Sequence, residues 1–145
     1  MKKILKNQNG ITIVILLLTI IVIAILTGVT IKNIDIGTDI KDYNFMCADI
    51  ELLKTKIQNY YNENGTIPIA DEIANAAIII GDQVSTRDAD GKYYKIDISK
   101  LYNITLNFGG GNTQNGDIYI INDKSHEIYY LKGTMLENTR YYRKK

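Results

Sequence analysis

Histidine and cysteine, two residue types common at catalytic and metal sites, each occur once in this 145-residue sequence. His126 is the single histidine, and no second histidine or neighbouring cysteine completes a zinc set. A catalytic triad would also need a positioned nucleophile, which the spacing does not offer. Cys47 is the single cysteine and falls on an apolar face, where we expect a buried small residue rather than a reactive thiol. The sequence predicts a protein that is not an enzyme and uses no cofactor.

Residues 86–97 can be laid on the twelve-residue loop that binds calcium between two helices. Asp88, Asp90 and Gly91 then take positions three, five and six, and Asp97 takes position twelve. Position one lacks an acidic residue, position twelve lacks the usual glutamate, and a strand pattern follows where a helix is needed. An Asp-Gly turn that leads into a strand is the alternative. We predict no metal site and keep Asp88, Asp90 and Asp97 as weak calcium candidates.

The longest apolar stretch of the chain is residues 11–31, which contain no charged side chain. As a helix with a rise of about 1.5 Å per residue it would reach about 30 Å, the thickness of the hydrocarbon core of a bilayer. Its polar side chains are threonines, whose hydroxyls can bond to their own helix. Lys2, Lys3 and Lys6 precede it, and basic residues stay on the cytoplasmic side. We therefore expect a transmembrane helix over residues 11–32, with the remainder of the chain outside the cell.

The junction before this helix resembles the prepilin-type signal of type IV pilins and pseudopilins. A short basic leader ends in Gly10, and Ile11, Thr12 and an aliphatic run follow, similar to the GIT-type starts of pilin-like proteins from Gram-positive anaerobes. The resemblance implies that prepilin peptidase cuts between Gly10 and Ile11 and that the new amine of Ile11 is methylated. It also implies that the retained helix serves in the membrane and then in a filament core; its first residues are Ile11, Thr12, Ile13, Val14, Ile15, Leu16, Leu17 and Leu18.

One position departs from the family pattern. Many pilins carry a glutamate at the fifth mature position, and Ile15 stands there in this chain. The substitution leaves open whether the chain is a major, minor or tip subunit. The sequence also leaves open whether the filament is a pilus, a secretion pseudopilus or a DNA-uptake pseudopilus.

The resemblance further implies partners and a location. The partners are other pilin or pseudopilin subunits, prepilin peptidase, membrane lipid and an assembly machinery with an inner-membrane platform and a motor ATPase. Removal of the leader with its three lysines leaves 14 basic against 16 acidic residues, so we expect no direct binding of nucleic acid. An uncleaved, membrane-anchored binding module and a globular protein secreted after ordinary signal cleavage are the alternatives.

Residues 33–145 are expected to form an extracellular head. Apolar residues recur every three or four positions from Ile36 to Tyr60, which predicts an amphipathic helix, with Asp49 among the polar residues off its apolar face. Gly65 and Pro68 place the helix end near residue 64.

The second half of the head reads mainly as strands. A short helix is predicted over residues 70–80, although residues 78–80 could equally begin a strand. A strand is expected over residues 93–97, a loop over residues 107–112, and a hairpin from residues 117–122 and 127–132, to which residues 139–142 could add a third strand. Adjacent tyrosines point to opposite faces of a strand, so about half should be exposed. The predicted fold class is α+β and pilin-like: one long N-terminal helix, transmembrane then amphipathic, packed on a small antiparallel sheet over residues 93–143.

Overall fold

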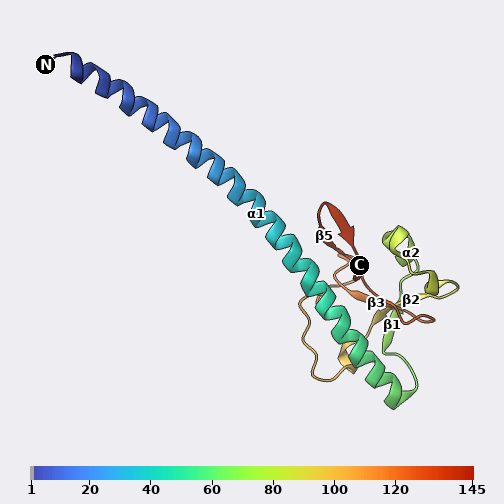
Figure 1. Cartoon of the computed structure of the whole chain (residues 1–145). Coiled ribbons are helices and arrows are strands. Elements are labelled where there is room, and N and C mark those ends of the chain that lie inside the picture. Colours follow the sequence, from blue (N-terminus) through green and yellow to red (C-terminus); the bar gives the residue numbers. More distant parts are fainter. Residues whose placement is uncertain (1) are drawn as a thin grey trace. The chain divides into compact units, whose positions relative to one another are not determined.

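The computed structural model describes residues 2–145, and within the first helix it describes the side chains of residues 13–23 and 37–64. The fold is α+β, as predicted, with a small antiparallel sheet. Two compact units, divided between Thr38 and Asp39, make up the chain. Helix α1 (Lys2–Asn64) supplies residues to both units, and every other element belongs to the second unit, hereafter the head (Figure 1). Among the residues that the structure describes, no helix is long and apolar enough to cross a membrane.

The head contains six short strands, one short helix and three 3-10 turns. In chain order they are β1 (Ile69–Glu72), α2 (Ala76–Ile80), η1 (Gly81–Gln83), η2 (Thr86–Asp88), β2 (Tyr93–Ile96), η3 (Ile98–Lys100), β3 (Tyr119–Asn122), β4 (Ile128–Tyr130), β5 (Thr134–Leu136) and β6 (Thr139–Tyr141). Strands β1 to β4 form one antiparallel sheet in chain order, and β5 and β6 form a separate two-stranded sheet.

Helix α1 ends at Asn64, where the glycine and proline pattern predicts the end. Gly65 adopts a φ of 71° and its N–H donates to the carbonyl of Tyr61 at 2.8 Å, which closes the last turn. The part of α1 that lies in the head buries a stripe with a spacing of three or four residues, made of Met46, Ile50, Leu53 and Ile57. The amphipathic helix is thus confirmed.

The predicted position of Asp49 on the polar face of this helix is wrong. It was placed off the apolar face, yet it is 2% exposed because it lies between Met46 and Leu53 on the buried side. Cys47 is half-buried and packs against the core instead of lying within it. Local spacing located the helix but not the outer limits of its buried face.

The predicted hairpin is confirmed as β3 and β4, and the predicted strand at residues 93–97 is confirmed as β2. The main chain pairs Tyr119 with Tyr130 and Tyr93 with Asn122, so β3 lies at the centre of the sheet between β2 and β4. All four residues of β3 are buried.

Two predictions for the head are wrong in part. Residues 70–80 do not form one helix, because Ile69–Glu72 pair with β2 as an edge strand and only Ala76–Ile80 are helical. The strand at residues 139–141 forms, but it pairs with the unpredicted β5 and not with the hairpin. The Gly133 turn separates β5 from β4, and Glu137 and Asn138 both adopt positive φ angles that make the tight β5–β6 turn.

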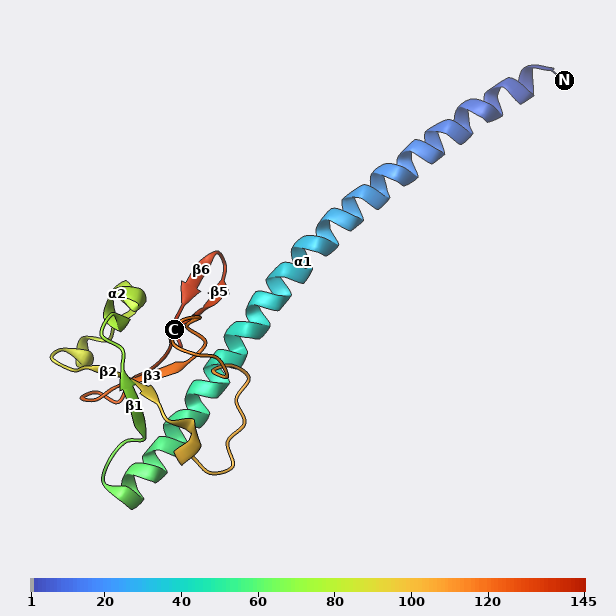
Figure 2. The same cartoon turned by 180° about the vertical axis from the view of Figure 1, so that it is seen from behind.

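Both faces of the four-stranded sheet are covered at β4, so the expected exposure of alternate tyrosines is wrong for Tyr129 and Tyr130, whereas on β2 Tyr93 is buried and Tyr94 is half-buried. Tyr130 packs with the buried stripe of α1, whereas Tyr129 packs on the opposite face with Ile73, Ala76 and Ile80. Tyr129 is 0% and Tyr130 is 2% exposed. Figure 2 shows the sheet with α1 on one side and the α2 segment on the other.

The last residues of the chain close the head against α1. The rings of Tyr43 and Tyr141 meet edge to face at 5.6 Å between centroids, and the N–H of Lys145 donates to the hydroxyl of Tyr43 at 2.8 Å. Lys144 lies 3.6 Å from Glu51. These contacts join residues about a hundred positions apart in the sequence.

Candidate functional site

The predicted processing site lies largely outside the described side chains. The side chains of Gly10, Ile11 and Thr12 are not among those described, whereas those of Ile13, Val14, Ile15, Leu16, Leu17 and Leu18 are. All six of the latter are exposed. The structure therefore bears on the predicted filament-core helix only from Ile13 onward.

Residues 13–23 of α1 form a continuous exposed apolar surface. Ten large aliphatic side chains in this segment are between 45% and 64% exposed, and they point in every direction around the helix. The one polar side chain, Thr19, donates its hydroxyl to the carbonyl of Leu16 at 2.7 Å. The segment holds no charged side chain. A surface of this kind can bind only apolar material, such as lipid tails or the apolar faces of other helices.

The three weak calcium candidates are not brought together as ligands. The side chain of Asp97 accepts hydrogen bonds from Ser99 and lies 3.6 Å from Lys100. Asp90 is exposed at a turn with a φ of 63°, and Asp88 is buried. Within the described part of the chain, no group of three His, Cys, Asp or Glu side chains could hold a metal ion.

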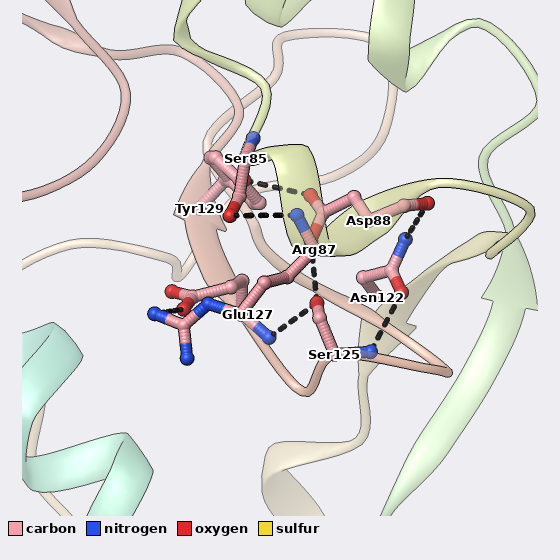
Figure 3. A network of polar contacts seen from close by, with 7 residues as sticks. All are labelled: Ser85, Arg87, Asp88, Asn122, Ser125, Glu127 and Tyr129. Carbon is pink, nitrogen blue, oxygen red and sulfur yellow. Dashed lines mark hydrogen bonds and ion pairs between the residues drawn. The ribbon is translucent and has the colours of Figure 1, made fainter.

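Asp88 instead forms the centre of a buried hydrogen-bond network. Its carboxylate accepts the hydroxyls of Tyr129 at 2.7 Å and Tyr93 at 2.8 Å, and also that of Ser125. Figure 3 shows that Ser125 and Tyr129 approach the carboxylate, while Asn122 donates its amide to the backbone carbonyl of Asp88. Three hydroxyl donors occupy most of the acceptor positions of one carboxylate, so this group is a structural anchor.

The surroundings of Asp88 explain why residues 85–91 follow a fixed path. The hydroxyl of Tyr129 accepts the N–H of Ser85 at 2.9 Å, and Arg87 forms an ion pair of 3.0 Å with Glu127 on the hairpin (Figure 3). A Cβ atom on Gly91 would lie 2.3 Å from the buried amide oxygen of Asn122, so a larger residue there would have to displace that side chain. The Asp-Gly pattern thus serves a close backbone approach.

Asp49 is a second buried anchor, and sequence reasoning missed it. Its carboxylate accepts the backbone N–H groups of Asn107 and Phe108 at 2.9 and 3.0 Å and the hydroxyl of Tyr119 at 2.8 Å. It therefore ties the loop between η3 and β3 to helix α1. The spacing of three residues from Met46 was the one signal in the sequence that placed Asp49 near the buried stripe.

Asp117 ends the same loop and holds it from the other side. It accepts the N–H of Gly109 at 2.8 Å and the hydroxyl of Tyr130 at 2.7 Å. Burial alone would raise the pKa of Asp117, but these hydrogen bonds outweigh it and hold the pKa below its ordinary value.

The tyrosines that donate to these carboxylates resist ionisation. Burial, and then the hydrogen bond to a carboxylate, raises the pKa of Tyr93, Tyr119, Tyr129 and Tyr130. Each hydroxyl therefore remains a neutral donor at physiological pH. The head thus uses tyrosine–aspartate pairs as buried cross-links between sheet, helix and loop.

His126 lies where the sequence predicts, in the turn between β3 and β4. It is exposed, has a φ of 58°, and its ring meets that of Tyr61 at 5.6 Å between centroids. The adjoining hollow measures about 250 Å³ and is also lined by Lys54, Gln58 and Glu127. Ser125 also lines it, but its hydroxyl is held by the buried carboxylate of Asp88.

No family model, curated protein or solved structure matches this chain. The arrangement of its own residues is therefore the ground for a functional assignment. That arrangement combines an apolar helix surface that needs a partner with a head closed by its own core and its own buried anchors.

Proposed function

We propose that this chain is a structural subunit of an extracellular type IV pilus or of a type II secretion-like pseudopilus. Its role is to assemble with other subunits and not to catalyse a reaction. The observation that carries the proposal is the exposed apolar surface of residues 13–23 on a helix that continues into a folded head. A globular protein buries such a surface, so a partner that is itself apolar must cover this one.

Two apolar environments cover this segment in succession. Before assembly residues 11–32 span the cell membrane, with the N-terminus in the cytoplasm and the head outside. Assembly then moves the segment from lipid into a bundle of equivalent helices. Each of the ten large side chains gains about 1.5–3 kcal/mol when it is fully buried from water, so the segment stays in one apolar environment or the other.

Processing at Gly10 makes this exchange possible. Cleavage between Gly10 and Ile11 removes the lysines of the leader, which would otherwise have to enter an apolar filament core. Prepilin peptidase makes the cut and methylates the amine of Ile11. An assembly platform and its motor ATPase supply the work of extraction.

The head supplies the surface of the filament. Its core, formed by α1 and the two faces of the sheet, belongs to residues 39–145 alone. The head can therefore stay folded while the apolar segment changes its surroundings.

The mature N-terminus tests the proposal directly. We expect the protein recovered from cells with an active prepilin peptidase to begin at Ile11, with an added methyl group, by intact mass and N-terminal peptide sequencing. Gly10→Leu should block processing and leave membrane insertion unchanged, because the lysines and the apolar run remain.

Gly37→Leu is the matched control. A Cβ atom at Gly37 meets nothing within 4 Å, so the same substitution there should leave processing unchanged. Wild-type protein that keeps its lysine leader would instead indicate an uncleaved, membrane-anchored module. Loss of the whole apolar segment would indicate ordinary secretion.

A further inference from the structure

Two surfaces of the head lie at opposite ends of its part of α1. The first, the acidic hollow, measures about 270 Å³. Its lining includes three carboxylates, two apolar side chains and one lysine: Asp39, Asp42, Asp117, Phe108, Met135 and Lys132, with Tyr130, Gly133 and Thr134 beside them. Asp39 and Asp42 are half-buried, and the head shows no ion pair for either of them within the described residues.

The second surface is the Tyr102 projection, formed by Tyr102 with the neighbouring Lys56 and Lys100. Tyr102 is 82% exposed, more than any other described aromatic side chain. The ammonium of Lys56 donates to the carbonyl of Tyr102 at 2.9 Å, which holds the turn against α1. Glu63 is the one acidic residue that lines the shallow depression beside Tyr102.

These two surfaces cannot meet within one molecule. Asp39 and Lys56 lie on the same helix, 17 residues apart, which corresponds to about 26 Å along its axis. The β5–β6 hairpin lies beside the first of these positions, since Thr134 contacts Met46 and Tyr141 contacts Tyr43. Any contact between the acidic hollow and the Tyr102 projection must therefore join two copies of the chain.

We infer that the Tyr102 projection of one copy docks in the acidic hollow of a second copy. The ring of Tyr102 would pack against Phe108 and Met135, a favourable contact for both an aromatic and a thioether side chain. Lys56 and Lys100 would then face Asp39 and Asp42. The opposite charges favour this orientation over contacts between two hollows or two projections.

This contact joins two different surfaces, so it leaves one hollow and one projection free at the ends of every open oligomer. A contact of this type continues from copy to copy when it does not close into a ring. The inference rests on the proposed assembly of the chain, and it names how neighbouring heads touch while their helices share a core.

Cross-linking between two single-cysteine chains tests the contact. In a Cys47→Ser background, full-length chains with Lys132→Cys at the hollow and chains with Asn59→Cys beside the projection are expressed together in the native cell and treated with a short bis-maleimide. Neither substitution replaces an acid of the hollow or Tyr102. We expect a 59–132 cross-linked dimer, identified by peptide mass, and much less dimer from either chain alone. Equal yields from a single chain alone, or no 59–132 product, would overturn the inference.

Charge reversal sharpens the test. Asp42→Lys or Lys56→Glu, placed in both chains, should each lower the 59–132 yield by about five-fold, near the upper limit for one exposed ion pair. The two reversals together restore opposite charges across the contact and should recover most of the yield. A yield unchanged by the single reversals, or a double reversal no better than either single one, would contradict it.

The same samples separate this inference from the proposed function. Chains that begin at Ile11 but give no 59–132 product would refute the contact and leave the filament role intact. Chains that retain the leader and still give the product would support the contact and refute processing into a filament.

Discussion

Two segments of helix α1 are both rich in apolar residues, but one segment exposes them and the other buries a stripe of them. In residues 13–23 every large side chain is exposed, whereas in residues 46–57 Met46, Ile50, Leu53 and Ile57 form a stripe that is at most 4% exposed. The difference lies in the distribution of polar residues. Glu51, Lys54 and Thr55 give the second segment a polar face exposed to solvent, and the first segment has no such face. A helix with one apolar face closes a core within its own chain, and a helix that is apolar all round depends on other molecules.

The largest difference between the two segments is expected at alkaline pH, where the head should unfold and residues 13–23 should remain helical. The pKa of four tyrosines of the head is raised, so the head keeps its full stability below the unfolded value of about 10 and loses it as the pH rises above that value. Residues 13–23 hold no titratable group. We expect full-length protein in detergent to lose tyrosine near-UV circular dichroism above about pH 10 and to keep part of its helical signal. Parallel loss of both signals would break the comparison.

A pair of leucine substitutions tests the comparison at single residues. Leu53 is 0% exposed, so Leu53→Ala should lower the free energy of unfolding of the head by about 2–5 kcal/mol. Leu17 is 59% exposed, and Leu17→Ala should change that free energy by less than about 0.5 kcal/mol. Thermal unfolding followed by near-UV circular dichroism measures both. A destabilisation of the head by Leu17→Ala equal to that by Leu53→Ala would show that the two segments are not independent.

Asp49 is the polar exception within the buried stripe. Asp49→Asn replaces one accepting oxygen with an amide N–H that faces the backbone and side-chain donors of Asn107, which should cost about 1–3 kcal/mol of unfolding free energy. Glu51→Gln, an exposed acid two residues away, is the control and should cost less than about 0.5 kcal/mol. Hydrogen exchange should also show faster exchange at Asn107 in the Asp49 variant. Equal effects from the two variants would mean that the loop does not depend on Asp49.

The smallest effect is expected at Thr19. Its hydroxyl already bonds to the carbonyl of Leu16, so Thr19→Val removes a polar group that needs no external partner. The free energy of unfolding of the head should change by less than about 0.5 kcal/mol, as measured by thermal unfolding. The fraction of protein that is extracted from the membrane should stay the same. A loss of membrane retention would show that the hydroxyl contacts another molecule.

The sequence predicted those parts of the head whose signal is local. The end of α1 follows from Gly65 and Pro68, and the β3–β4 hairpin follows from two β-branched and aromatic runs with a short turn. Strand β1 was missed because Ala70, Asp71 and Glu72 are exposed edge residues with no apolar alternation.

The buried anchors could not be predicted from spacing. Asp49 meets its partners 58 to 70 positions away, and Asp88 meets Ser125 and Tyr129 about 40 positions away. Nothing in the local pattern distinguishes such aspartates from solvated ones, because the donors that make their burial favourable come from other elements. The same limit applies to the calcium pattern at residues 86–97, where the aspartates proved to have separate roles.

The contacts of Tyr43 with Tyr141 and Lys145 set the order of events during synthesis. Tyr43 leaves the ribosome about a hundred residues before its partners, so the base of the head stays open until Tyr141 and Lys145 have been synthesised. Contacts of such long sequence separation slow folding, because the intervening chain must be brought together first. Under the proposed function, residues 11–32 therefore have time to enter the membrane before the head can fold, and the head would complete its fold on the outer side.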